Sequence, residues 1–288
     1  METHTRPLLL VSNDDGHTSF FLRALVDSLC QTYDVCVVAP LEEQSWVGRA
    51  MTRRGMLEVI ALDDWPCPAW AVSGRPADCI NIGLHHLTSR RPAAVVSGMN
   101  LGFNISLPLT LSSGTVAAAT EGALAGLPAI AFSLALAPHD FALVSAQHGR
   151  RDEAGDQITR RAASRASEIT RDLLAQPQLP YSVHNVNFPP DVSEDAPLTH
   201  TELALSEIPS LFEPIQTSLE IGHTSDQTPG TQSTVTHPSK RPPHRYQFSF
   251  ASKWNYTHNP ESSDLKALKR GEISHTLIRW DQISSDST

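Results

Sequence analysis

The sequence LLLVSNDDG at residues 8–16 is an apolar run that gives way directly to two adjacent carboxylates. A short, continuous apolar run is typical of a strand that is buried on both faces of a parallel sheet. In such sheets, ligands bind at the edge where the strands end. The stretch therefore predicts a strand of a parallel sheet and the first candidate functional residues, Asp14 and Asp15.

The same alternation continues outward from this stretch. Further short apolar runs occupy residues 35–39, 93–96, 129–134 and 183–188. Helical patterns or helix-start signals occupy residues 21–29, 76–84, 115–125 and 158–174, the last after a polar excursion over 139–157. Strands that alternate with helices predict an α/β fold with a Rossmann-like, doubly wound, mostly parallel sheet.

The pattern changes toward the C-terminus. Residues 222–244 are rich in Thr, Ser, Pro, Gly and His, which favours a mobile loop, whereas Tyr246, Phe248 and Phe250 alternate as in a half-buried strand. We therefore predict a core over residues 1–198 and a β-rich C-terminal extension over 199–288. The extension is expected to be an oligomerisation arm that gives a homodimer or a homotetramer. The alternative is that it folds back onto its own core.

Composition excludes several classes of partner. The 288 residues are 40% hydrophobic, enough for a real core, and carry a formal net charge of −9. Without a Lys/Arg-rich run, neither a nucleic-acid polymer nor an anionic membrane is an expected partner. No apolar run is long enough for a membrane span or a signal-peptide core. The four cysteines lack CxxC spacing, so we expect reduced thiols and a cytoplasmic protein.

Two kinds of loop carry candidate chemistry. Asp14 and Asp15 follow the first strand, and adjacent carboxylates are costly unless a cation or hydrogen-bond donors compensate them. Mg²⁺ or Mn²⁺, which prefer oxygen ligands, would do so. The alternative is a polar turn that caps the next helix. Residues 112–115 (SSGT) precede a helix, where free N–H groups, hydroxyls and a glycine can bind a phosphate. The alternative there is ordinary N-capping by Ser113 or Thr115.

An ordered set of motifs runs along the chain. The motifs are VSNDDG at 11–16, AP at 39–40 with QS at 44–45, RPADC at 75–79, VSGMNLGFN at 96–104, SGTV at 113–116 and NVNFP at 185–189, followed by a closing segment that includes Ser263-Asp264, Gly271, Ser274 and Thr276. Together they resemble the SurE survival-protein family of 5′/3′-nucleotidases. The likeness is dense over residues 8–134 and thinner beyond. Two departures stand out: Trp46 follows the serine at 45 in place of the usual Gly, and Arg75 replaces a usual Thr. Both put the substrate preference in question.

The resemblance implies a role for each motif. It implies a divalent cation on Asp14, Asp15, Ser45 and Asn100, and phosphate contacts from Ser113, Gly114 and Thr115 with help from Asn104. It also implies hydrolysis of nucleoside 5′/3′-monophosphates, and in some members of short polyphosphate. We expect metal-assisted attack of water, with one aspartate as the base.

Two rival functions remain. A dinucleotide-dependent oxidoreductase would need GxGxxG after the first strand, and residues 13–18 (NDDGHT) do not supply it. A catalytically silent nucleotide-binding or scaffold protein would keep the fold and lose the chemistry.

Overall fold

The structure is a computed structural model that describes residues 6–137, 140–215, 244–249 and 259–284. The chain divides into two compact units, one of residues 1–205 with 258–288 and one of residues 206–257. The first unit contains a nine-stranded sheet with the helices that cover it, and the second contributes a two-stranded sheet. The segment over residues 222–244, for which the sequence predicts a mobile loop, lies outside the described residues except for His244.

The nine-stranded sheet has the order β3-β4-β2-β1-β5-β6-β7-β11-β8. Its strands are β1 (Leu8–Ser12), β2 (Asp34–Pro40), β3 (Val59–Ala61), β4 (Ala69–Val72), β5 (Ala94–Leu101), β6 (Ala129–Leu134), β7 (Ser182–Phe188), β8 (Leu198–Thr201) and β11 (Ile273–Arg279). The central strands from β4 to β7 are parallel, whereas β3 and β11 run antiparallel to their inner neighbours. The predicted mostly parallel α/β sheet is confirmed.

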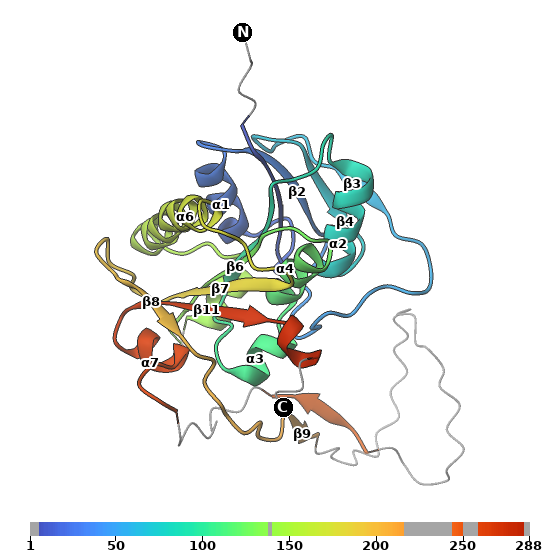
Figure 1. Cartoon of the computed structure of the whole chain (residues 1–288). Coiled ribbons are helices and arrows are strands. Elements are labelled where there is room, and N and C mark those ends of the chain that lie inside the picture. Colours follow the sequence, from blue (N-terminus) through green and yellow to red (C-terminus); the bar gives the residue numbers. More distant parts are fainter. Residues whose placement is uncertain (1–5, 138–139, 216–243, 250–258, 285–288) are drawn as a thin grey trace, which may run out of the picture. The chain divides into compact units, whose positions relative to one another are not determined.

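Helices cover both faces of this sheet (Figure 1). They are α1 (Phe20–Leu29), α2 (Pro76–Ile82), the π-helix η1 (Gly83–Leu87), α3 (Leu107–Ser112), α4 (Gly114–Leu124), α5 (Phe141–Ala146), α6 (Glu153–Leu174), α7 (Asp264–Lys269) and the 3-10 helix η2 (Asp281–Ser284). Leu9 and Val11 of β1 pack in the cluster that contains α1 and α6, while Leu8 and Leu10 pack in the one that contains α2. Alternate residues of one strand thus face different helical layers, which is the doubly wound arrangement.

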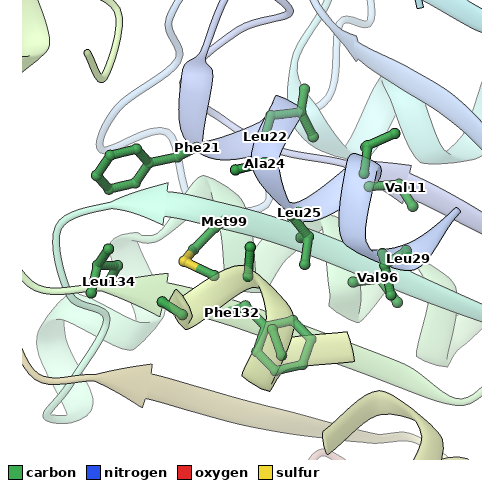
Figure 2. Close-up of a cluster of buried hydrophobic side chains, with 14 of the residues drawn as sticks. Val11, Phe21, Leu22, Ala24, Leu25, Leu29, Val96, Met99, Phe132 and Leu134 are labelled. Atoms are coloured by element: carbon green, nitrogen blue, oxygen red, sulfur yellow. The ribbon is translucent and has the colours of Figure 1, made fainter. Parts of the chain in front are cut away.

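The larger core lies between α1 and the strands β1, β5 and β6 (Figure 2). Phe21, Leu22, Leu25 and Leu29 of α1 are fully buried there. They recur at helical spacing, which places them on the face that meets the sheet. The helix begins where the Ser19 side chain accepts a hydrogen bond from the Leu22 N–H.

Two element boundaries differ from the prediction. Helix α6 begins at Glu153, before the predicted start at residue 158, because Asp152 caps it by accepting from the Gly155 N–H at 2.8 Å. Its first turn is polar, so apolar spacing did not mark it. Strand β5 continues to Leu101, whereas the sequence predicted an end at Ser97-Gly98. An extra residue between Ser97 and Asn100 interrupts the register with β6 without ending the strand.

Part of the predicted extension belongs to the main sheet. Strand β11 pairs antiparallel with β7 and parallel with β8. The buried carboxylate of Asp264 accepts hydrogen bonds from the N–H groups of Ser106 at 2.7 Å and Ala204 at 2.9 Å. It thereby joins α7 to the segment before α3 and to the segment after β8. The boundary at residues 198 and 199 stays a prediction.

The second unit exposes aromatic side chains. Strands β9 (Phe212–Pro214) and β10 (Tyr246–Phe248) pair antiparallel, with Phe212 opposite Phe248. Tyr246 is 60% exposed and Phe248 is 46% exposed, so both count as exposed side chains, whereas the alternation predicted a half-buried strand. Phe250 lies outside the described residues.

Three histidines lie on neighbouring strands at the β7–β11–β8 end of the sheet. His184 Nδ1 lies 2.8 Å from His275 Nε2, and the His200 ring lies 4.8 Å from the His275 ring. Burial lowers the pKa of His275 to about 3, with His184 and His200 adding to the effect, and lowers the pKa of His184 to about 4. Both imidazoles are therefore neutral in the folded protein at neutral pH.

We expect this pair to make the protein acid-sensitive. Folded pKa values below the ordinary 6.5 mean that the unfolded chain binds more protons between pH 6.5 and 4. The two histidines therefore cost no stability above pH 6.5, and the free energy of unfolding falls below it, by up to about 1.4 kcal/mol per pH unit for each histidine. Chemical unfolding of wild type and His275→Phe from pH 7 to 5 checks this. A difference between the two unfolding free energies that did not change with pH would contradict it.

Helix hydropathy and the state of the cysteines are the two structural features that bear on the environment of the protein. Across the described ranges, no helix combines the length and apolar character that a membrane-spanning helix needs. Cys30, Cys36, Cys67 and Cys79 are free thiols. The cytoplasmic location stays a prediction.

Candidate active site

The candidate site lies where the order of the sheet reverses direction. From β1 the chain proceeds to β2 and β4 on one side, and then from β5 to β6 and β7 on the other. Residues that follow β1 and end β5 therefore meet at the switch point between these two neighbouring strands. Asp14 and Asp15 come from the first of these segments, and Asn100 comes from the second.

Asp14 is held against the start of α4. The Thr115 hydroxyl Oγ1 donates to Asp14 Oδ1 at 2.6 Å, and the side chain of Asp14 is almost fully buried. A Cβ added to Gly114 would lie 2.7 Å from Asp14 Cβ and 2.9 Å from Oδ2, closer than real atoms approach. Only glycine allows this approach, so the SGT loop predicted as a phosphate cradle also positions the first aspartate.

Asp15 contacts the end of β5. Its Oδ2 accepts a hydrogen bond from the Leu101 N–H at 2.8 Å, directly beside Asn100. Burial raises the pKa of Asp14 to about 6 and raises that of Asp15 well above its ordinary value, the charge of Asp14 adding to the second shift. Two adjacent carboxylates, Asp14 buried and Asp15 partly buried, leave negative charge that a bound cation would compensate.

The extra residue in β5 places Asn100. Ser97 pairs with Ala131 and Asn100 with Ser133, so three steps on β5 match two on β6. Gly98 has a φ of +127°, and a Cβ there would lie 2.3 Å from the Phe132 carbonyl oxygen. Such an irregularity redirects the side chains that follow it. Asn100 is consequently buried next to the Asp15 contact.

Ser45 lies in the loop after β2, which is tied to the acidic loop. The Gln44 N–H donates to the Asp14 carbonyl at 2.7 Å, and the His17 N–H donates to the Pro40 carbonyl at 2.9 Å. The exposed Ser45 hydroxyl donates to Glu43 Oε1 at 2.6 Å. The structure therefore brings the two loops together, with Ser45 bonded to a carboxylate.

Glu43 is the residue that sequence reasoning missed. Its charge contributes to the raised pKa values of both Asp14 and Asp15, after burial and, for Asp15, after Asp14. The signal available in the sequence was its position two residues before Ser45. It went unused because an exposed glutamate in an acidic chain is common.

The start of α4 is capped by a serine, and its phosphate-binding role stays a prediction. Ser113 Oγ accepts from the Val116 N–H at 3.0 Å and so caps the helix, as the alternative interpretation held. The Thr115 hydroxyl is not used as a cap, since it donates to Asp14. The orphan N–H groups of the first turn still give this helix an anion-attracting end next to the carboxylates.

Asn104 is held from several directions. Its Nδ2 donates to Ser133 Oγ at 2.9 Å, its N–H donates to Asn187 Oδ1 at 2.7 Å, and its carbonyl accepts from Asn185 Nδ2 at 2.8 Å. The Asn185–Pro189 motif of the sequence therefore fixes the segment after β5. One side-chain amide hydrogen of Asn104 is therefore used in a hydrogen bond within the protein.

The donor set suits a hard divalent cation. Asp14 and Asp15 supply carboxylate oxygens, Ser45 a hydroxyl and Asn100 an amide, all of the type that Mg²⁺ or Mn²⁺ prefers. Within the part of the chain that the structure describes, no three His, Cys, Asp or Glu residues form a metal-binding group. A site built from two carboxylates and neutral oxygens would instead leave room for substrate and water.

Several known proteins are similar to this chain in sequence. The model of the family described as "Survival protein SurE" matches residues 9–208. A protein of Deinococcus radiodurans named 5′-nucleotidase SurE is 42% identical over 187 residues, which cover 64% of this chain and 63% of the relative. A protein of the same name from Methanosarcina acetivorans is 35% identical over 208 residues, covering 69% of this chain and 73% of the relative.

A solved structure agrees in fold. The SurE protein from Aquifex aeolicus superposes with a TM-score of 0.64 at 24% identity, covering 95% of this chain and 93% of that one. The sequence match thus spans just under two thirds of the Deinococcus relative, while the fold match extends over nearly all of both chains.

Proposed function

This chain belongs to the SurE survival-protein family, and from that membership we propose that it is a divalent-metal-dependent phosphomonoesterase acting on nucleoside 5′- or 3′-monophosphates. One observation carries the proposal beyond family membership. The hydrogen bond from Thr115 to Asp14 joins a cation-binding carboxylate to a phosphate-binding helix end. A cation and a phosphate would then meet at one place, as phosphoryl chemistry requires.

Each candidate residue has its own role in the proposed reaction. The first-turn N–H groups of α4 and the hydroxyl of Ser113 bind and orient the phosphate. A divalent cation bound at the site would neutralise charge on the phosphate oxygens and acidify the attacking water. One of Asp14 and Asp15 accepts the proton of that water. Asn100 and Ser45 complete the oxygen donors.

A phosphate-release assay tests the proposal. Purified protein would be incubated with 5′- and 3′-monophosphates of each nucleoside and with tripolyphosphate, in Mg²⁺, Mn²⁺ or EDTA. We expect release from nucleotides with either metal and none with EDTA. Calorimetric binding of a nucleotide without release in any metal would instead favour a silent binding protein.

We also propose that the exposed aromatics of the second unit lie in a homodimer or homotetramer interface. Phe212 is 57% exposed, its ring centroid lies 5.9 Å from that of Phe248, and Tyr246 is more exposed still. Grouped exposed aromatic surface of this kind marks association sites.

Light scattering of matched variants checks the assembly. We expect wild type to be a dimer or tetramer and Phe212→Glu/Phe248→Glu to dissociate to monomers, because charge is costly in an apolar interface. Leu179→Glu, at an exposed leucine of the first unit, should leave the assembly unchanged. A wild-type mass that corresponds to a monomer at every concentration would contradict the prediction.

A further inference from the structure

A large aromatic side chain stands uncovered beside the candidate site. Phe141, the first residue of α5, is 46% exposed. Its Cε2 atom lies 3.6 Å from the point that a Cβ on Gly102 would occupy, and Asn100 Nδ2 lies 3.7 Å from the same point. The Phe141 ring and the amide of a candidate metal ligand thus lie on either side of one point beside Gly102, which we call the Gly102 notch.

The chemistry of this notch matches one part of a nucleotide. The phosphate would lie among Asp14, Asn100 and the start of α4, which are charged or polar. An exposed aromatic face at the border of such a site offers a flat apolar surface, on which every nucleobase can stack whatever its hydrogen-bonding groups. Sugar and phosphate have no comparable face.

We propose that Phe141 is a specificity-determining residue that stacks on the nucleobase of the bound nucleotide. The inference rests on the proposed function and deepens it, because it explains how the enzyme distinguishes a nucleotide from a simpler phosphomonoester. Stacking adds affinity for the base and does not touch the phosphate. Its loss raises KM for nucleotides and leaves kcat nearly constant.

Kinetics on two substrates that differ only in the base test this. For Phe141→Ala we expect KM for a purine nucleoside 5′-monophosphate to rise about tenfold while the kinetics of ribose 5-phosphate stay unchanged. Phe141→Tyr should restore the KM. Leu143→Ala, at a 62% exposed leucine on the same helix, is the matched control. Equal losses on both substrates, or none on either, would overturn the inference. A wild-type enzyme that hydrolysed neither would refute the proposed function itself, and the inference with it.

A second inference comes from two cysteines away from this site. Cys30 caps the end of α1, and Cys67 lies just before β4. Both are half-buried and line a cavity of about 500 Å³, together with Cys36 and Arg6. The interaction between the two thiols lowers the pKa of Cys30 and raises that of Cys67. Nothing in the proposed reaction uses either sulfur.

We infer that Cys30 and Cys67 form an oxidisable pair that hydrogen peroxide converts to a disulfide. The Cys30 thiolate attacks one peroxide oxygen, which breaks the O–O bond, gives a sulfenic acid and releases hydroxide that takes up the thiol proton as water. The Cys67 thiol then attacks the Cys30 sulfur, forming the S–S bond and releasing a second water. Two thiols lose two electrons and peroxide gains two.

Mass spectrometry of the full chain after peroxide treatment decides the matter. We expect wild type to lose two hydrogens and to give a Cys30–Cys67 cross-linked peptide. Cys67→Ser should instead stop at a sulfenic acid on Cys30 that dimedone traps. Cys79→Ser, at a buried cysteine, should behave as wild type. Persistent sulfenic acid in wild type, a different intramolecular pair, or unreacted thiols at both positions would overturn the inference.

Discussion

Replacing Asp14 with Asn is expected to lower kcat by about two to four orders of magnitude and to abolish tight Mn²⁺ binding. The substitution removes one of two charges that the site offers a cation, while asparagine keeps an oxygen that can accept the Thr115 hydrogen bond. Asp15→Asn should act similarly. Asp15 accepts a hydrogen bond from the Leu101 N–H and so lies next to Asn100, another candidate metal ligand. Phosphate release and calorimetric Mn²⁺ titration of each variant measure the two effects.

Stability separates this loss from simple unfolding. Burial raises the pKa values of both carboxylates, and the charge of Asp14 raises that of Asp15 further, so the metal-free protein is destabilised by keeping them charged. Removing one charge should leave the metal-free unfolding midpoint equal or higher, as occurs where function opposes stability. Asp195→Asn, at an exposed carboxylate, is the control and should change neither activity nor stability. Near-normal rates for both site variants in saturating Mn²⁺ would show that the metal lies elsewhere.

The sequence predicted the parts of the fold that apolar patterning determines. The runs before Asp14 and at 129–134 became buried parallel strands because both faces of each must be apolar. The placement of Asp14 and Asp15 at the sheet edge followed from the same pattern. Where a boundary depended on a polar cap, as at Asp152, or on one extra residue, as in β5, apolar spacing carried no signal.

The candidate site shows what patterning cannot supply. The Thr115–Asp14 hydrogen bond spans 101 positions of sequence, and each residue alone had an adequate local explanation as a cap or a turn. The contribution of Glu43 likewise depends on the loop after β2 folding over the loop after β1. Family motifs indicated which residues act together, and the contacts indicate how two of them are linked. The metal and phosphate roles themselves stay predictions.

Gly114→Ala is expected to inactivate the enzyme while leaving the chain folded. The added methyl would lie 2.7 Å from Asp14 Cβ and 2.9 Å from its Oδ2, so the carboxylate has to move. Asp14 cannot move freely, since it is buried and bonded to Thr115. A displacement of about 1 Å at a reacting centre can cost about 100-fold in rate. We therefore expect kcat/KM to fall by about that factor or more.

A matched glycine distinguishes this from general crowding. Gly155 lies in the first turn of α6, and a Cβ there would lie 2.7 Å from Arg151 Cβ, with none of the candidate site residues among its nearest neighbours. Gly114→Ala and Gly155→Ala should both change stability by an overpacking cost of about 1–3 kcal/mol, offset by the higher helix propensity of alanine. Only the first should lose activity and Mn²⁺ affinity. If Gly114→Ala kept wild-type kcat/KM, the close approach of the α4 start to Asp14 would be irrelevant to catalysis. The proposed link between the cation site and the phosphate site would then be wrong, because the substitution would have altered the contact between Asp14 and the start of α4 without affecting catalysis.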